Sequence, residues 1–394
     1  MPVIDFHAHI FPNPIEKVLP HIPKLVPKGA AGDKIRPYLS EMSLRMGLGL
    51  GRRMARQFLQ PVSEKMHTAQ VWMRHLPSAV RHGLDSVGGV ASLPRLLVES
   101  TADDLIEAMD EAGVDQALVI AHPPFATNEM VLEACSMNPD RLIPVVNIAK
   151  GEDDPAAKFR KYLDQGAKVL KIHAAADGEG VDSARYRALL EVAQERRIPV
   201  ILHTGCIQNR LFYKDPSWGK VESFAPWFEA YRDVTFVLAH MNFHEPMKAL
   251  EMCELYSNLV VDTSWQPAEI IGEAVRRIGA ERVLFGTDWP FVGQNIALGK
   301  SRIEEGVESG VYTREQADLV LGGNAVRILA AAGASNANET VGDSSHSTDD
   351  TDNASTASHS SGAPEEPTPT ETVAPAKKRK KRPTTEAGAP EGAH

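Results

Sequence analysis

The chain has 394 residues, of which 43% are hydrophobic and 6% aromatic, proportions that are ordinary for a globular protein. A formal net charge of −10 argues against a general affinity for nucleic acid. No run approaches the roughly 18 apolar residues that a membrane span needs, and no basic segment followed by an apolar stretch marks a signal peptide.

The three cysteines, Cys135, Cys206 and Cys253, lie far apart and show no CxxC spacing. Such a set gives neither a disulfide framework nor a zinc ribbon. We therefore expect a reduced, cytoplasmic protein. By length alone, the chain could form two domains or a single large α/β barrel.

The first predicted element is a short buried strand that begins at Val3 and ends at His9. Because side chains alternate across a strand, we expect Asp5, His7 and His9 to face the same way. A pair of imidazoles on one face at the end of a strand can bind one metal ion, although such pairs also arise by chance. The remaining strands decide between these two interpretations.

Residues 11–99 contain several prolines and carry a positive charge, with thirteen Lys and Arg against six Asp and Glu. Gly47, Gly49 and Gly51 do not form a dinucleotide-binding motif, because no strand precedes them in a compact βαβ unit. We predict a largely helical insertion that lies over the ends of the strands.

From residue 101 onward, predicted helices and strands alternate. Thr101 suits a helix cap, and Asp103 and Asp104 suit the positive end of that helix. The strands are apolar runs of the kind that a parallel sheet buries on both faces. After the first, the predicted strands are 116–121, 142–148, 167–173, 199–203, 234–240, 259–262 and 282–288. The predicted helices are 101–113, 128–137, 156–165, 183–197, 225–232, 246–256, 267–279 and 313–332.

Alternation of strands and helices implies right-handed crossovers and a parallel sheet. Eight such units that close on themselves form a TIM barrel, which is the α/β fold that we predict for residues 1–332. A doubly wound open sheet is the alternative.

Residues 333–394 are rich in Ser, Thr, Asp, Glu, Pro and Gly, and we predict a disordered tail there. Its basic run, residues 377–382, is interpreted as a solvated charge block. A nuclear signal or a weak contact with a polyanion is the alternative.

In a TIM barrel the active site lies at the carboxyl ends of the strands. A histidine that ends one apolar run is often a satisfied core residue, but the same pattern on several strands indicates a metal site. Three imidazoles and a carboxylate suit a borderline divalent ion such as Zn²⁺, and a catalytic site leaves a coordination position open. The polar residues at the strand ends are His7, His9, Lys171, His173, His203, His240 and Asp288.

Three motifs carry a resemblance to a known family. Residues 4–12 read IDFHAHIFP, residues 283–291 read VLFGTDWPF, and residues 323–329 read GNAVRIL. They resemble the amidohydrolase superfamily, and more narrowly its amidohydrolase-related (amidohydrolase 2) branch, which includes aminocarboxymuconate-semialdehyde decarboxylase. The resemblance covers residues 1–11 and about 100–332.

By position, the resemblance implies that one Zn²⁺ ion binds to His7, His9, His203 and Asp288. It also implies that His240 helps to activate the bound water. Asp262 fits the pattern of the branch on strand 7.

Two features stand out against the pattern of the branch. Members often have glycine two residues after the strand 6 histidine, where this chain has Asn242, which we interpret as part of the pocket floor or a substrate contact. Lys171 and His173 share a face of strand 4 and are predicted to contact the substrate. Some superfamily members carboxylate such a lysine to bridge two metal ions. For Lys171 the alternative is an inward positive charge that balances Asp288 or a substrate carboxylate.

We predict a hydrolase that uses a metal-activated water on a small substrate with a carboxylate, and in which His240 and Asp288 move protons. Arg45, Arg52 and Arg53 of the insertion are predicted to hold that carboxylate. The first alternative is a non-oxidative decarboxylase of an aromatic or unsaturated acid at the same site. The second is a metal-binding protein without catalysis. The resemblance also implies a homodimer with an arginine supplied across the interface.

Overall fold

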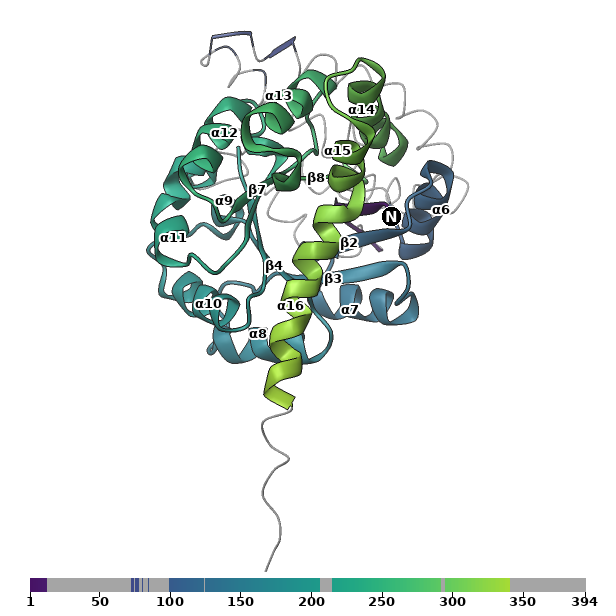
Figure 1. Cartoon of the computed structure of the whole chain (residues 1–394). Coiled ribbons are helices and arrows are strands. Elements are labelled where there is room, and N and C mark those ends of the chain that lie inside the picture. Colours follow the sequence, from purple (N-terminus) through teal and green to yellow (C-terminus); the bar gives the residue numbers. More distant parts are fainter. Residues whose placement is uncertain are drawn as a thin grey trace, which may run out of the picture. The chain divides into compact units, whose positions relative to one another are not determined.

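The computed structural model describes residues 1–12, 72–73, 75–77, 80, 84, 99–123, 125–205, 215–291 and 295–340, the last eight of these by their backbone alone. All of them belong to one compact unit, Met1–Ser344, and the second unit, Ser345–His394, contains no described residue. An eight-stranded parallel sheet forms the centre, and each strand pairs with the next in chain order (Figure 1). The strands are β1 (Ile4–Ala8), β2 (Gln116–Ile120), β3 (Leu142–Val146), β4 (Val169–Ile172), β5 (Val200–His203), β6 (Phe236–Ala239), β7 (Leu259–Asp262) and β8 (Val283–Leu284).

The sheet closes on itself where β1 meets β8 and the residues after it, a junction that we call the barrel seam. The amide of Phe6 donates to the carbonyl of Phe285 (2.8 Å), and the amide of His9 donates to the carbonyl of Trp289 (2.7 Å). A parallel bridge pairs Ala8 with Trp289. The predicted TIM barrel is confirmed, and the open-sheet alternative is wrong.

An irregularity in β1 decides where its histidines point. Between Asp5 and Ala8 the pairing with β2 shifts register, as in a β-bulge. Phe6 lies in the hydrophobic cluster inside the barrel, whereas Ala8 belongs to the cluster outside it. His7 and His9 therefore follow Phe6 into the barrel, and Asp5 faces outward. The prediction that Asp5 shares a face with the histidines is wrong, because the shift interrupts the alternation.

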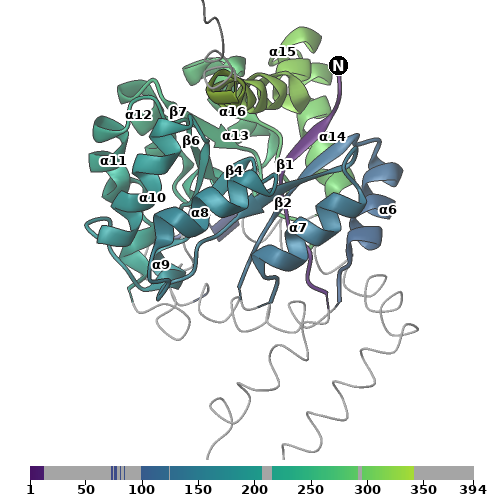
Figure 2. The same ribbon diagram turned by 90° about the horizontal axis from the view of Figure 1, so that it is seen from below.

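Helices connect the strands and cover the outside of the barrel (Figures 1 and 2). At the start of α6, Thr101 and Asp104 form a capping box, in agreement with the predicted helix start. The α-helices are α6 (Ala102–Ala112), α7 (Asn128–Met137), α8 (Pro155–Asp164), α9 (Ala174–Asp177), α10 (Ala184–Glu195), α11 (Ala225–Ala230), α12 (Pro246–Leu255), α13 (Ala268–Ile278), α14 (Ile296–Glu308), α15 (Arg314–Asp318) and α16 (Asn324–Thr340). Short 3-10 turns are η2 (Pro216–Gly219), η3 (Val221–Phe224), η4 (His240–Asn242) and η5 (Ala280–Arg282).

The carboxyl-terminal helices differ from the prediction. The sequence did not indicate α14, and the single helix predicted over 313–332 is divided into α15, a π-helical turn η6 (Leu319–Gly323) and α16. The turn brings the chain close to the amino terminus, since a Cβ on Gly322 would lie 1.8 Å from the carbonyl oxygen of Pro2. α16 continues to Thr340, beyond the predicted start of the tail at residue 333.

α16 closes one end of the barrel. Its Ala325 and Ile328 belong to the cluster inside the barrel, together with residues of the strands such as Phe6. Nδ2 of Asn324 donates to the carbonyls of Ala280 (2.7 Å) and Val283 (2.8 Å). In Figure 2 α16 and the amino terminus lie at the same end of the barrel, and α9, which follows β4, lies at the other. The carboxyl ends of the strands are therefore left for a site.

Several predictions concern residues outside the described ones and stay predictions. They are most of the insertion 11–99 with Arg45, Arg52 and Arg53, residue Cys206, and the tail beyond residue 340 with its basic run at 377–382. None of the described helices combines the length and the apolar character that a bilayer crossing requires.

Candidate active site

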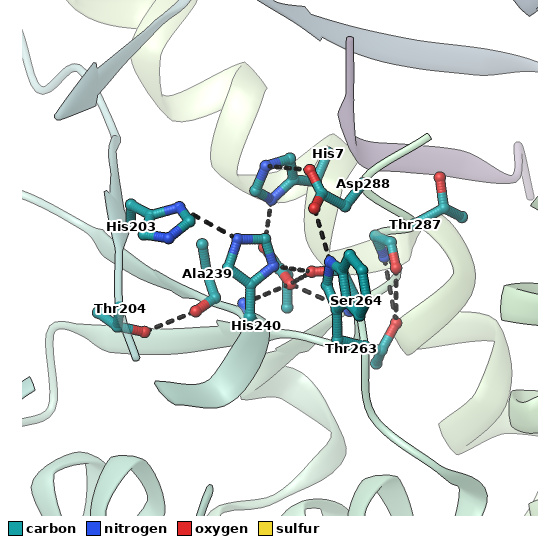
Figure 3. Close-up of polar contacts among 12 residues, drawn as sticks. His7, His203, Thr204, Ala239, His240, Thr263, Ser264, Thr287 and Asp288 are labelled. Atoms are coloured by element: carbon teal, nitrogen blue, oxygen red, sulfur yellow. Dashed lines mark hydrogen bonds and ion pairs between the residues drawn. The ribbon is translucent and has the colours of Figure 1, made fainter. Parts of the chain in front are cut away.

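Polar side chains from β1, β5, β6, β7 and β8 meet at the carboxyl end of the barrel (Figure 3). His7, His240 and Asp288 are all at most 6% exposed, so the groups face one another rather than solvent. Ionisable side chains are seldom buried at this level unless they pair with one another or hold a metal ion.

His7, His9 and Asp288 point their ligand atoms toward one another. Nε2 of His7 lies 3.4 Å and Nε2 of His9 lies 3.2 Å from the same oxygen, Oδ1 of Asp288. Nδ1 of His7 lies 2.8 Å from Oδ2 of Asp262, and Nδ1 of His9 lies 3.1 Å from the carbonyl of Ile120. Because a carbonyl and a carboxylate only accept hydrogen bonds, both Nδ1 atoms carry a proton. With a metal ion between them and Asp288, both Nε2 atoms can offer the ion a lone pair. Histidines that bind a metal ion are held in this way.

Among the described residues, two groups of side chains could hold a metal ion. One consists of His7, His9 and Asp288, and the other of His7, His240 and Asp262. Two imidazole nitrogens with a carboxylate oxygen, as in the first group, suit a borderline divalent ion. The predicted ligands His7, His9 and Asp288 therefore come together.

The predicted ligand His203 is in neither group. Its ring stacks on His173, with the ring centroids 3.7 Å apart and the planes 10° from parallel. Its Nδ1 lies 3.3 Å from Nε2 of His240. The structure thus places His203 next to the predicted proton carrier, and its role as a ligand stays a prediction.

The electrostatics of the site favour neutral imidazoles beside ionised carboxylates. Burial lowers the pKa of His9 and lowers that of His240 to about 3. Burial alone would raise the pKa of Asp262, but neighbouring His7 lowers it to about 2. Asp288 behaves in the same way, because His240 and His9 hold its pKa below the ordinary value in spite of burial. These protonation states are the ones in which the side chains bind metal.

β4 contributes Lys171 and His173 to the site. Lys171 is buried, and its Nζ lies 3.5 Å from Nε2 of His7. Nδ1 of His173 accepts a hydrogen bond from the amide of Ala176 (3.3 Å) and so caps α9. Substrate contacts by Lys171 and His173 stay predictions.

The loop after β6, which carries His240, has an unusual backbone. Consecutive residues from His240 to Phe243 have φ angles between 44° and 61°. Such left-handed conformations are uncommon for residues other than glycine and persist only where the surroundings enforce them. Gln266 donates from Nε2 to the carbonyls of His240 (2.5 Å) and Phe243 (3.1 Å). Gly205 leaves the space that the loop occupies, since a Cβ there would lie 2.3 Å from the carbonyl carbon of Asn242.

The side chain of Asn242 secures this loop. Its Oδ1 accepts from the amide of Val221 (3.3 Å), and its Nδ2 donates to the carbonyl of Glu245 (3.1 Å). Both ends of the amide therefore bond to backbone groups. These contacts explain why this chain has asparagine where members of the branch often have glycine. The predicted substrate contact by Asn242 stays a prediction.

Two residues that follow β7 belong to the site but were not predicted from the sequence. Oγ of Ser264 lies 2.7 Å from Nδ1 of His240, and Nε1 of Trp265 donates to Oδ2 of Asp288 (2.6 Å). They lie two and three residues after Asp262, so their position at a strand end was a signal that could have found them.

Aromatic rings surround His9 on the side of β1, β2 and β8. Phe291 meets His9 edge to face with centroids 5.2 Å apart, and Phe11 stacks on it at 5.9 Å. His122, which follows β2, lies edge to face at 5.7 Å. Burial lowers the pKa of His122 to about 3, so this ring is also neutral. His122 was missed because it stands alone after its strand.

A family model described as Amidohydrolase matches residues 4–330. The chain belongs to the amidohydrolase family. The match extends from β1 into α16 and confirms the resemblance that the motifs indicated. This amidohydrolase is therefore an enzyme of a metal-dependent family, and the alternative of a protein without catalysis is wrong.

Two solved structures share the fold of this amidohydrolase. An uncharacterized TIM-barrel protein from Bordetella bronchiseptica is 23% identical, with a TM-score of 0.50 over 59% of this chain and 83% of the other. 4-Oxalomesaconate hydratase from Rhodopseudomonas palustris is 16% identical, with a TM-score of 0.51 over 86% of this chain and 99% of the other. No curated protein matches the chain. At these identities the likeness shows the fold alone.

Proposed function

We propose that this amidohydrolase is a zinc-dependent hydrolase that acts on a small substrate bearing a carboxylate. The observation that carries the proposal is the convergence of two ring nitrogens on one carboxylate oxygen. Nε2 of His7 and Nε2 of His9 lie 3.4 and 3.2 Å from Oδ1 of Asp288, while oxygen partners hold their Nδ1 protons. Both Nε2 atoms therefore point toward the same carboxylate oxygen, and each can offer a lone pair to an ion bound between them.

Zn²⁺ is the proposed ion because imidazole nitrogens with one carboxylate suit a borderline divalent cation. When bound, such an ion lowers the pKa of a coordinated water and polarises a carbonyl group. His7, His9 and Asp288 would hold it, with His203 as the proposed further ligand. Trp265 orients the carboxylate of Asp288 through the hydrogen bond from Nε1.

His240 is the proposed proton carrier. Burial keeps its ring neutral, because it lowers the pKa to about 3, and a neutral ring can take a proton from water. Asp288 is ionised in the free enzyme, so it would first accept a proton that the attacking water loses and then pass that proton to the leaving group. Lys171 is the proposed anchor for the substrate carboxylate, since its buried Nζ lies 3.5 Å from Nε2 of His7. Arg45, Arg52 and Arg53 remain proposed as further contacts.

A non-oxidative decarboxylase is the second candidate. The buried Lys171 supports it as much as it supports a hydrolase, because both substrates have a carboxylate to bind. Loss of CO₂ from an unsaturated acid requires a held carboxylate and a proton delivered to carbon. His240 can deliver that proton only in its protonated form, which burial disfavours. Hydrolysis begins with the neutral ring that the free enzyme holds, whereas decarboxylation begins with a protonated ring, so we rank hydrolysis first. The fold is shared with a hydratase of 4-oxalomesaconate, and we extend a carboxylate-bearing substrate to this chain on that basis.

Metal analysis and a substrate panel test the proposal. Purified full-length protein should hold about one equivalent of zinc, and a chelator should abolish turnover that added Zn²⁺ restores. Lactones, amides, carboxylated enols and aromatic acids are then compared by ring opening, ammonia release and CO₂ release. Release of CO₂ without hydrolysis would favour the second candidate, and full activity in metal-free protein would refute both.

We further propose a cytoplasmic homodimer. The cysteines without paired spacing suit a reducing compartment, and the resemblance of the motifs supports a dimer. Sedimentation equilibrium gives the mass in solution, and a monomer that retains full activity would contradict the dimer.

A further inference from the structure

We propose that Asp262 and Ser264 are positioning residues that fix the proton of His240 on Nδ1 and leave Nε2 to act on the substrate. The inference rests on the proposed function, in which His240 carries the proton. Neither residue touches the reacting atoms. Both act through the imidazole of His240.

The carboxylate of Asp262 collects hydrogen bonds from three parts of the barrel. Its Oδ2 lies 2.8 Å from Nδ1 of His7 on β1. Its Oδ1 accepts from the amide of His240 (2.9 Å), from the amide of Ser264 (3.1 Å) and from the hydroxyl of Ser264. Asp262 is fully buried. Because four donors hold its two oxygens, the carboxylate has a fixed orientation.

The hydroxyl of Ser264 decides where the proton of His240 lies. A hydroxyl has one hydrogen, and that of Ser264 is directed at Oδ1 of Asp262, an oxygen that only accepts. Toward Nδ1 of His240, 2.7 Å away, Oγ of Ser264 can then only accept. Nδ1 must therefore carry the proton of the neutral ring, and Nε2 must carry the lone pair.

The other neighbour of the ring agrees with this assignment. Nε2 of His240 lies 3.3 Å from Nδ1 of His203, from which it can accept a hydrogen bond. His203 then keeps its own lone pair on Nε2, as the predicted ligand role requires. Figure 3 shows the line of contacts from His203 through His240 to Ser264.

One carboxylate thus sets the proton on two histidines with different tasks. Asp262 acts directly on His7, whose Nε2 faces Asp288, and it acts through Ser264 on His240. The ligand and the proton carrier are therefore aligned by the same side chain of β7. Removal of the Ser264 hydroxyl breaks only the second of these two connections.

Nitrogen NMR tests the inference without a substrate. Full-length protein labelled with ¹⁵N-histidine is measured with and without Zn²⁺, and the signals of His240 are identified by their loss in His240→Gln. Ring nitrogen shifts distinguish a protonated from an unprotonated atom. We expect a protonated Nδ1 in the wild type and in Ser264→Thr, which keeps the hydroxyl. Ser264→Ala should lose the preference, while Ser301→Ala, which removes an exposed hydroxyl of α14, should not.

Protonation of Nε2 in the wild type would overturn the inference, and so would an unchanged tautomer in Ser264→Ala. The wild-type measurement decides the question even where Ser264→Ala folds poorly. Once a substrate is found, Ser264→Ala should lower kcat on the order of tenfold or more, the effect expected of an orienting partner. KM and zinc content should stay near wild type. Absence of zinc and turnover would contradict the proposed function, whereas the NMR result still decides the tautomer.

Discussion

Three histidines of the site each have a ring nitrogen bonded to an oxygen of the protein, and that bond determines what the other nitrogen can do. His7 relies on Asp262, His9 on the carbonyl of Ile120, and His240 on Ser264. A free imidazole exchanges between tautomers, so these oxygens select the one that the site needs. Residues that never touch a metal ion are for this reason expected to control its affinity.

Asp262→Asn should weaken zinc binding. An amide offers one acceptor and one donor in place of two acceptors, so whichever way it turns, an NH₂ group meets a donor of the wild-type network. We expect the zinc affinity to fall by about 10- to 100-fold, as measured by competition with a chromophoric chelator. The exposed Asp233→Asn is the matched control and should bind as wild type does. Undiminished affinity in Asp262→Asn would show that His7 does not depend on this partner.

Asp5→Asn should stabilise the protein at neutral and alkaline pH. Burial raises the pKa of Asp5 from its ordinary 3.8 to about 7. Between these pH values the folded state binds more protons than the unfolded state, so stability falls as pH rises. A uniformly neutral amide removes that loss, and one pKa unit corresponds to about 1.4 kcal/mol.

Urea denaturation at pH 4 and pH 8 measures this effect. The gain from Asp5→Asn should exceed about 1 kcal/mol at pH 8 and be much smaller at pH 4. Asp233→Asn controls for the loss of one charge at the surface. Equal effects of Asp5→Asn at the two pH values would exclude titration of Asp5 as the cause.

At the level of elements, the loop after β6 is the most constrained part of the site. Its left-handed residues are held by Gln266, by Asn242 and by the close approach of Gly205.

The order of elements and the strand-end histidines could be predicted from the sequence, because apolar runs and the spacing of His7 and His9 are local signals. The conformation of this loop could not, because it depends on side chains of other strands.

Two further elements show the same limit. The bulge in β1 is set by pairing with β2, so alternation within residues 3–9 could not reveal that Asp5 faces outward. α14 contains Gly299 and Gly306, which obscure its apolar pattern. Their meaning appears only in the fold, where Gly299 packs near Thr287 and a Cβ on Gly306 would meet Tyr312 at 2.2 Å.

Gly205→Ala should damage the loop that carries His240. The new methyl group would lie 2.3 Å from the backbone of Asn242, in addition to the strain of a φ angle of 71°. Gly178→Ala is the matched control, because its φ angle is 66° and no atom lies within 4 Å. The control should lose about 1 kcal/mol, as measured by thermal unfolding.

Gly205→Ala should lose clearly more stability than this control and should also reduce turnover. A loss of stability equal to that of Gly178→Ala would mean that the loop can move aside without cost.

At the level of the whole molecule, the described chain forms its barrel with segments from both ends of the sequence. β1 completes the sheet against β8, and α16 fills the opposite end of the interior with Ala325 and Ile328. Residues 1–12 and 283–340 therefore contribute to both the catalytic end and the closed end. Stability and catalysis are expected to depend on both.

Two truncations test this organisation. A chain that ends at Thr340 keeps every described element and should match the full chain in melting temperature and turnover. A chain that ends at Gly323 loses α16 and with it the apolar contacts of Ala325 and Ile328. Each buried side chain of this kind contributes on the order of 1 kcal/mol or more, so the shorter chain should unfold at markedly lower temperature. A shorter chain as stable as the full one would show that α16 is dispensable.

The barrel seam links the earliest and the latest strands to leave the ribosome. His7 and His9 leave the ribosome before the other strands of the barrel, but Asp288, their partner across the seam, emerges only after β8. An ion bound by these three residues would stabilise the contact between β1 and the segment after β8, which is the last strand pairing of the barrel that can form. The supply of zinc in the cell would then govern how many newly made chains mature, as well as how fast each finished enzyme works.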